Sequence, residues 1–113
     1  MKEQIKVIVK RPGEKYGHIA YIDNKLKAFQ HLVGGYIETI SVDDLVIVCN
    51  EEGKLRSLMP NLIINGDTVV GTIVVCGVDA GEFTDCPVEM NEWRKMIDPY
   101  KVVWKGEPKT NGI

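Results

Sequence analysis

The run from Thr68 to Cys76 constrains the fold more than any other part of the chain. It carries five β-branched aliphatic side chains in nine positions, which makes it the most strand-like stretch of the chain. The shorter run from Leu45 to Cys49 is apolar throughout, so both of its faces are expected to be covered. We therefore predict a sheet with residues 68–76 at its centre. Gly71 interrupts this run and indicates a bulge or a close approach of another backbone.

The first helix is expected after residue 24. Leu26, Phe29 and Val33 recur at helical spacing and would form one buried stripe. The short polar side chains of residues 23–24 can cap the helix, since an oxygen there accepts a free backbone N–H. Gly34 is placed to end the helix in a left-handed conformation.

A second helix is expected near the end of the chain. Met90, Trp93 and Ile97 give its apolar stripe, residues 84–85 offer a cap, and Pro99 ends it. The remaining segments read as short strands and turns, with Asn-Gly at residues 65–66 as a tight turn. Residues 50–53 are expected to form a hairpin loop that needs a positive φ at its glycine. The expected strands are 4–10, 16–22, 36–42, 45–49, 54–58 and 68–76, with a brief apolar run at 62–64 and a candidate last strand at 100–104.

These elements predict a two-layer α+β domain. Its mostly antiparallel sheet has about six strands, because most connections are too short for crossover helices. Two helices would cover one face of that sheet. One domain is expected over residues 1–104, followed by a flexible C-terminal tail at 105–113.

Composition narrows the class of function. The formal net charge of −2 argues against a nucleic-acid partner, which normally needs a basic face. No apolar run approaches the length of a membrane span, so no membrane partner is expected. The three cysteines form no C-x-x-C pair and suggest a reducing compartment, in agreement with a cytoplasmic protein. No cofactor and no metal site are expected.

Four blocks of the sequence resemble a known family. They are the helix end with VGGYIE at 33–38, NEEGKL at 50–55, Pro60-Asn61, and Gly71-Thr72 opening an apolar strand. Together they resemble a domain of unknown function found in small proteins of bacteriophages, plasmids and integrative elements, over residues 4–98. The resemblance implies a mobile-element origin and the cytoplasm of a bacterial host. It implies no catalytic residues.

The candidate binding site joins the glycine stop at Gly34 to the loop at 50–54. An aromatic ring there can stack on a base, and a carboxylate can accept hydrogen bonds from ribose hydroxyls or an exocyclic amine. The competing interpretation is a helix cap followed by a half-buried strand and a hairpin turn, and spacing alone favours it. The candidate ligand-binding residues are Gln30, Gly34, Gly35, Tyr36, Glu38, Asn50, Glu51, Glu52, Lys54 and Asn61.

The function that these observations favour is non-catalytic. The chain would be a small binding protein of a bacteriophage or mobile element that sequesters a nucleotide, such as one used in host defence signalling. It would act as a homodimer or higher homo-oligomer. Two alternatives stay open: a protein-interaction module that inhibits a host factor, and a small enzyme acting on a nucleotide. The enzyme is the less favoured class, because no Cys–His pair, matched acid and base, or metal-ligand spacing stands out.

Overall fold

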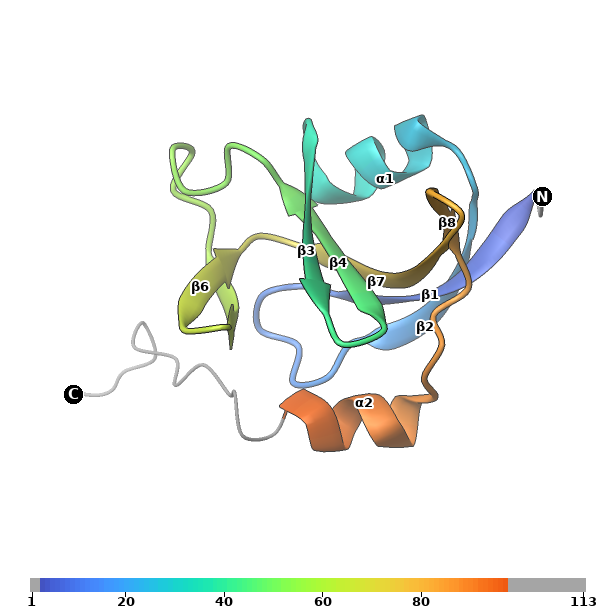
Figure 1. Cartoon of the computed structure of the whole chain (residues 1–113). Helices are drawn as coiled ribbons and strands as arrows, with labels where there is room; N and C mark the ends of the chain where they lie inside the picture. Colours follow the sequence, from blue (N-terminus) through green and yellow to red (C-terminus); the bar gives the residue numbers. More distant parts are fainter. Residues whose placement is uncertain (1–2, 98–113) are drawn as a thin grey trace.

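The computed structural model describes residues 3–97, and within them a six-stranded sheet forms the centre of the molecule (Figure 1). Its strands are β1 (Gln4–Lys10), β2 (His18–Asp23), β3 (Ile37–Val42), β4 (Leu45–Asn50), β7 (Ile73–Asp79) and β8 (Glu82–Thr84). The order is β2-β1-β7-β4-β3, with β8 paired to β7. All paired neighbours run antiparallel. A separate hairpin consists of β5 (Pro60–Ile64) and β6 (Asp67–Val70).

β7 lies at the centre of the sheet, as predicted, and its side chains alternate between two cores. Each core forms on one face, because successive residues of a strand point to opposite sides. One core contains Ile8, Leu45, Ile47, Leu62, Ile64, Val69, Ile73, Val75, Trp93 and Ile97. The other contains Ile5, Val7, Val9, Phe29, Val33, Val46, Val48, Val74 and Cys76.

The two helices, α1 (Leu26–Val33) and α2 (Met90–Ile97), lie on opposite faces of the sheet (Figure 1). Phe29 of α1 belongs to one core, whereas Trp93 of α2 belongs to the other together with the β5–β6 hairpin. The α+β class and the mostly antiparallel six-stranded sheet are confirmed. The prediction of two layers with both helices on one face is wrong, because helical periodicity identifies a buried stripe but not the face that it covers.

The run 68–76 is two strands and not one. Gly71 adopts φ +79°, a left-handed conformation that breaks the extended backbone between β6 and β7. β6 can therefore turn away from the main sheet and pair with β5. The turn between these two strands is the predicted Asn-Gly pair, with positive φ at both Asn65 and Gly66.

Residues 51–57 form consecutive turns, so the predicted hairpin loop and the return strand at 54–58 are wrong. The backbone winds through bonds such as Arg56 N–H to the Glu52 carbonyl at 2.9 Å. Gly53 needs no positive φ. It is required for space, since a Cβ there would lie 2.7 Å from Cγ2 of Val70.

The ends of α1 differ in how well local sequence predicted them. Gly34 ends the helix at φ +83°, as expected, and its N–H donates to the Gln30 carbonyl. The expected N-cap is wrong: Lys25 occupies that position without a side-chain bond, while Asn24 donates to the Phe83 carbonyl instead. Leu26 is 56% exposed and does not belong to the buried stripe.

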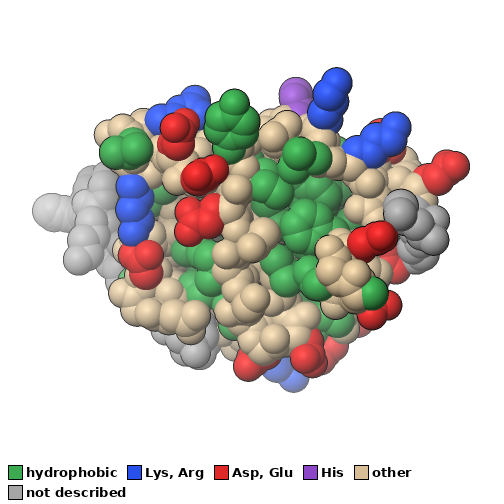
Figure 2. Space-filling view, turned by 45° about the horizontal axis from the view of Figure 1, so that its top comes forward, with side chains coloured by type: hydrophobic (Ala, Val, Ile, Leu, Met, Phe, Trp, Pro, Cys, Tyr) green, Lys and Arg blue, Asp and Glu red, His purple; other side chains and the backbone are tan. Residues whose placement is uncertain are grey.

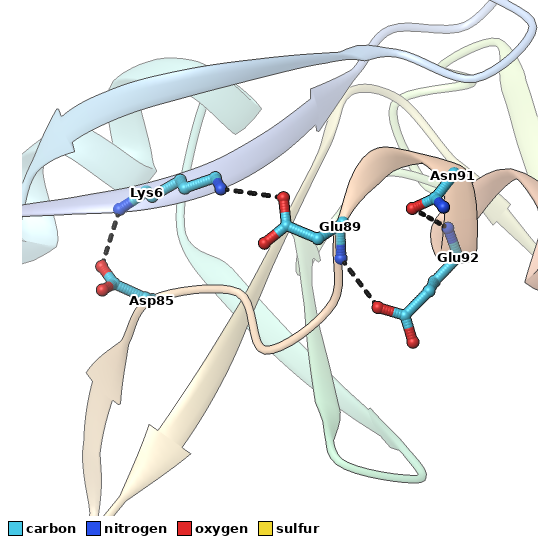
Figure 3. A network of polar contacts seen from close by, with 5 residues as sticks. All are labelled: Lys6, Asp85, Glu89, Asn91 and Glu92. Carbon is cyan, nitrogen blue, oxygen red and sulfur yellow. Dashed lines mark hydrogen bonds and ion pairs between the residues drawn. The ribbon is translucent and has the colours of Figure 1, made fainter.

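α2 begins later than predicted because Asp85 is engaged elsewhere (Figure 3). Its Oδ1 accepts the Lys6 backbone N–H at 2.9 Å, and the Cys86 N–H donates to the Lys6 carbonyl. The Lys6 ammonium forms an ion pair with Glu89 just before the helix. These bonds hold residues 85–89 against β1, so the helix starts only at Met90.

No helix within residues 3–97 is long and apolar enough to cross a membrane. The predicted strand at 100–104, the helix end at Pro99 and the tail at 105–113 lie outside the described residues.

Candidate functional site

A cleft of about 140 Å³ lies between the β3–β4 pair and β6, with part of the segment 51–57 along its side. Four of the predicted site residues line it: Glu38, Asn50, Glu51 and Lys54. The other lining residues are Ile40, Cys49, Leu55, Asp67, Thr68, Val69 and Val70. The cleft therefore combines aliphatic walls with several charged groups, which is the composition of a small-molecule site.

Asn50 shapes the cleft but has few groups left for a ligand. It is 4% exposed, and its Nδ2 donates to the Val33 carbonyl at 3.0 Å. Its Oδ1 accepts the Glu52 N–H at 2.8 Å. The amide therefore joins the end of α1 to the first turn after β4. Glu51 lies in that turn, so its backbone is held by the same amide.

The thiol of Cys49 lies beside Glu38 across the β3–β4 ladder. Burial, together with the charge of Glu38, raises the pKa of this thiol to about 11. A thiol with that pKa is protonated at neutral pH, and the protonated form is a poor nucleophile. Cys49 is thus part of the apolar wall of the cleft.

An ion pair joins two elements at the cleft. The Lys54 ammonium lies 2.6 Å from Oδ1 of Asp67, and both side chains are well exposed. This hydrogen bond and the charge of Lys54 lower the pKa of the Asp67 carboxyl. With Glu38 and Glu51 also lining the space, three carboxylates face one ammonium, so the cleft has a negative balance.

Asp67 was not predicted from the sequence. It follows the Asn-Gly turn, where an acidic residue is ordinary, so no local signal marks it. Only the folding of the β5–β6 hairpin against the turns after β4 brings it to Lys54.

The glycine corner does not line the cleft. The N–H groups of Gly34 and Gly35 both donate to the Gln30 carbonyl, so neither amide is left for a ligand. The Gly34 carbonyl accepts Nη1 of Arg56 at 2.7 Å. Tyr36 is 66% exposed and is not part of the cleft lining.

Glu52 and Asn61, the remaining predicted site residues, also lie outside the cleft lining. Glu52 is exposed, and its backbone takes part in the turns that follow β4. Asn61 is 2% exposed, and its Oδ1 accepts the ammonium of Lys10 at 2.7 Å. Its Nδ2 donates to the carbonyls of Lys10 and Gly71, each at 2.8 Å. Asn61 therefore joins the β5–β6 hairpin to β1.

Lys10 was also missed by sequence reasoning. It is 3% exposed, and burial lowers the pKa of its ammonium, against a smaller opposing effect of Glu14. The alternating pattern of residues 4–10 indicated that Lys10 lies on a solvated face of the strand. No local feature of the sequence shows that the Asn61 amide, 51 residues away, covers this lysine.

A larger hollow of about 190 Å³ lies between the β3–β4 turn, β5 and α2. Most of its lining is aliphatic or aromatic, so it offers fewer groups that could orient a polar ligand. Its lining residues are Val42, Asp43, Leu45, Ile47, Leu62, Ile63, Ile64, Asn65, Trp93, Met96 and Ile97. In residues 3–97, no group of three or more His, Cys, Asp or Glu side chains is placed to hold a metal ion.

A family model described as a domain of unknown function, DUF3846, matches residues 5–98. Comparisons with curated proteins and with solved structures give no match.

Proposed function

Because the chain belongs to the DUF3846 family, whose description states no activity, we propose its function from the site itself. The proposal is non-catalytic binding of a nucleotide or similar small ligand, held by its base in the cleft beside β3. The observation that carries it is the convergence of Glu38, Glu51 and the Lys54–Asp67 pair on one space with aliphatic walls.

The size and charge of the cleft suit the base of a nucleotide better than its phosphates. Pockets that bury a whole drug-sized ligand measure about 300–1,000 Å³, so 140 Å³ accommodates only part of a nucleotide. A negative balance disfavours phosphates but suits the amino groups of a base, which donate to carboxylates. The phosphates would remain at the exposed rim. The aliphatic side chains of Ile40 and Val70 would contact the faces of the ring.

The chemistry of the cleft lining favours binding of a ligand over catalysis on that ligand. The one thiol at the cleft is protonated at neutral pH, for the reason given above. Sequestration requires only affinity, which two charge-assisted hydrogen bonds and an apolar contact supply. A small enzyme acting on the same nucleotide remains the alternative in which Glu38 or Glu51 would transfer a proton.

A specific observation favours a second candidate, a protein-interaction module that inhibits a host factor. Leu55 and Met59 are 86% and 58% exposed on the segment between β4 and β5, and Tyr36 is 66% exposed. Exposed apolar side chains that lie together in one patch are typical of docking surfaces. Figure 2 shows hydrophobic side chains exposed beside acidic and basic ones on one face of the molecule.

The biological setting is part of the proposal. The resemblance to small proteins of phages, plasmids and integrative elements supports action in the cytoplasm of a bacterial host. There the ligand would be a nucleotide of host defence signalling, and the protein would act as a homodimer or higher homo-oligomer.

Calorimetric titration with a panel of cyclic and ADP-ribose-type nucleotides tests the proposal. We expect one class to bind, and we expect Glu38→Gln and Glu51→Gln each to weaken binding by about 10- to 100-fold, the loss of one charged hydrogen bond. Glu82→Gln is the matched control, since this exposed carboxylate lies on β8 and does not line the cleft.

Absence of binding across the panel would contradict the nucleotide proposal. Stoichiometric capture of one host protein would favour the interaction module instead. Turnover of a bound nucleotide that Glu38→Gln or Glu51→Gln abolishes would establish the enzyme.

A further inference from the structure

We propose that β3 is the pairing edge of a twofold dimer, in which a second copy of the chain adds its own β3 antiparallel and extends the wall of the cleft. The pairing follows from the free backbone edge of β3, and its register follows from the charge of Glu38. Its role in ligand binding rests on the function proposed above.

The backbone of β3 has a free side. Within residues 3–97 it pairs with β4 and with no other strand. Glu51 N–H donates to the Tyr36 carbonyl at 2.8 Å, so residues 36 and 51 form a hydrogen-bonded pair of the β3–β4 ladder. Because bonded pairs alternate along antiparallel strands, Glu38, Ile40 and Val42 direct their backbone groups to β4. Thr39 and its neighbours two positions away, 37 and 41, direct theirs outward.

This edge has no proline, lysine or bulge, and Glu38 is its one charged residue. Edge strands are commonly protected by proline, lysine or a bulge. β5 has such protection, with Pro60 at its start and a register shift between Pro60 and Leu62. β3 contains neither proline nor lysine, and its register with β4 runs without a shift from Ile37 to Val42.

The charges of the strand select one register. If Ile40 lies opposite Ile40 of the second copy, Glu38 lies opposite Val42 of that copy. The two Glu38 positions are then four residues apart along the strands, about 13 Å, so their repulsion is weak. A shift that placed Glu38 opposite Glu38 would bring like charges together, which is unfavourable in a sheet. In the favoured register the outward groups of Thr39 and Ser41 bond to each other across the axis.

The second copy would contribute to the cleft. Glu38 and Ile40 of the edge strand line it, so a strand added beside β3 continues that wall. An axis perpendicular to the sheet keeps both clefts on the same face, and the Val42 side chain of the second copy lies next to Glu38. The dimer thus extends a space that is too small alone for a whole nucleotide. Among the described strands of this sheet, β2 and β8 also have a single neighbour, and neither contributes a residue to the cleft lining.

Sedimentation velocity of the full chain without ligand tests the pairing. We expect a mass twice that of the chain for the wild type. Thr39→Pro removes an outward N–H without touching the β3–β4 ladder, and we expect a monomer with an unchanged circular dichroism spectrum. Thr39→Val keeps the N–H and should stay dimeric. A monomeric wild type, or a dimeric Thr39→Pro, overturns the proposal.

A cross-linking experiment tests the register even if Thr39→Pro misfolds. Ile40→Cys places two thiols across the axis in a non-hydrogen-bonded pair, where Cα atoms are about 4.5 Å apart and a disulfide can form. We expect a covalent dimer under mild oxidation. Ser41→Cys is the control, since its thiols would be too far apart, and the wild type reports on the three buried cysteines. Cross-linking of Ser41→Cys as fast as Ile40→Cys, or of neither, overturns the register. Because no ligand is present, these outcomes leave nucleotide binding untouched.

Discussion

Lys10 and Asn61 show how single residues hold the parts of this fold together. An ammonium that is 3% exposed is unfavourable unless hydrogen bonds replace its water. Asn61 supplies such a bond at 2.7 Å and donates both protons of its amide to backbone carbonyls. Three polar groups, the ammonium and the carbonyl of Lys10 on β1 and the carbonyl of Gly71, are thereby satisfied by one side chain. The position of the hairpin, and with it one wall of the cleft, depends on this amide.

We predict that Asn61→Ala lowers the free energy of unfolding by about 3 kcal/mol, because two carbonyls lose their amide donor and the buried ammonium keeps only its longer bond to the carbonyl of residue 61. Urea denaturation measures the effect. Lys10→Met should cost less, since it removes the charge and leaves an aliphatic chain in the same space. Asn61→Asp is the sharper control: it can pair with the ammonium but presents a carboxylate oxygen to two carbonyls. A loss below about 1 kcal/mol for Asn61→Ala would mean that water replaces the amide.

At the scale of elements, the end of α1 and the start of β3 are joined by two glycines, each required for a different structural reason. Gly34 has φ +83° and open space around its missing Cβ, the nearest atom being Asn50 Nδ2 at 4.0 Å. Gly35 has no left-handed φ, but a Cβ there would lie 3.0 Å from Asn50 Nδ2 and 3.2 Å from Arg56 Nη1. One glycine is required by conformation and the other by proximity to the Asn50 amide.

Substitutions by alanine and asparagine should distinguish the conformational requirement at Gly34 from the lack of space at Gly35. Gly34→Ala should cost about 1–2 kcal/mol of stability from left-handed strain, and Gly34→Asn less, since asparagine tolerates that region. Gly35→Ala should instead displace the Asn50 amide and the turns after β4. Denaturation measures the first effect, and amide chemical shifts of residues 50–53 measure the second. Equal shifts there from both alanine variants would contradict this division.

For the molecule as a whole, three buried thiols make the free energy of unfolding depend on pH in the alkaline range. Burial raises the pKa of Cys76 from 9.0 to about 12 and that of Cys49 from 9.0 to about 11, and it also raises the pKa of Cys86. Between pH 9 and these values the unfolded chain loses protons that the folded chain keeps. The free energy of unfolding then falls by about 1.4 kcal/mol per pH unit for each thiol. The lowered pKa of Lys10 acts in the opposite direction below 10.5, because there the unfolded chain binds the extra proton.

We therefore predict that stability is steady below pH 9, as far as the thiols are concerned, and declines above it. Urea denaturation at steps from pH 8 to pH 10.5 measures the slope. Cys76→Ala should make that slope shallower, whatever it costs at neutral pH, whereas Lys10→Met should make it steeper. An unchanged slope in Cys76→Ala would show that its thiol titrates alike in both states.

The features that local sequence predicted are those with a local cause. The apolar run at 45–49, the positive φ of Gly34 and the Asn-Gly turn at 65–66 each follow from a few neighbouring residues. The failures have distant causes. Asn24 bonds to Phe83 and does not cap its helix, and Gly53 accommodates Val70 and does not form a hairpin turn.

The same division holds for the candidate site. Glu38, Asn50, Glu51 and Lys54 were predicted because they lie on adjacent strands and the turn that follows them. Asp67 was not, because it reaches Lys54 only when the β5–β6 hairpin folds back. Tyr36 and the glycine amides were grouped with the cleft by proximity in sequence, but the carbonyl of Gln30 takes the amides.

By itself, the sequence determined an α+β chain with a valine-rich central strand, two amphipathic helices and a glycine stop before β3. Composition and periodicity are sufficient for this, since they report which side of each element avoids water. Tertiary structure alone decided that the helices cover opposite faces and that the backbone turns at Gly71. It also decided that the Lys54 ammonium and the three carboxylates of Glu38, Glu51 and Asp67 line one cleft. These outcomes depend on contacts between residues far apart in the chain, whose free energies no local pattern encodes.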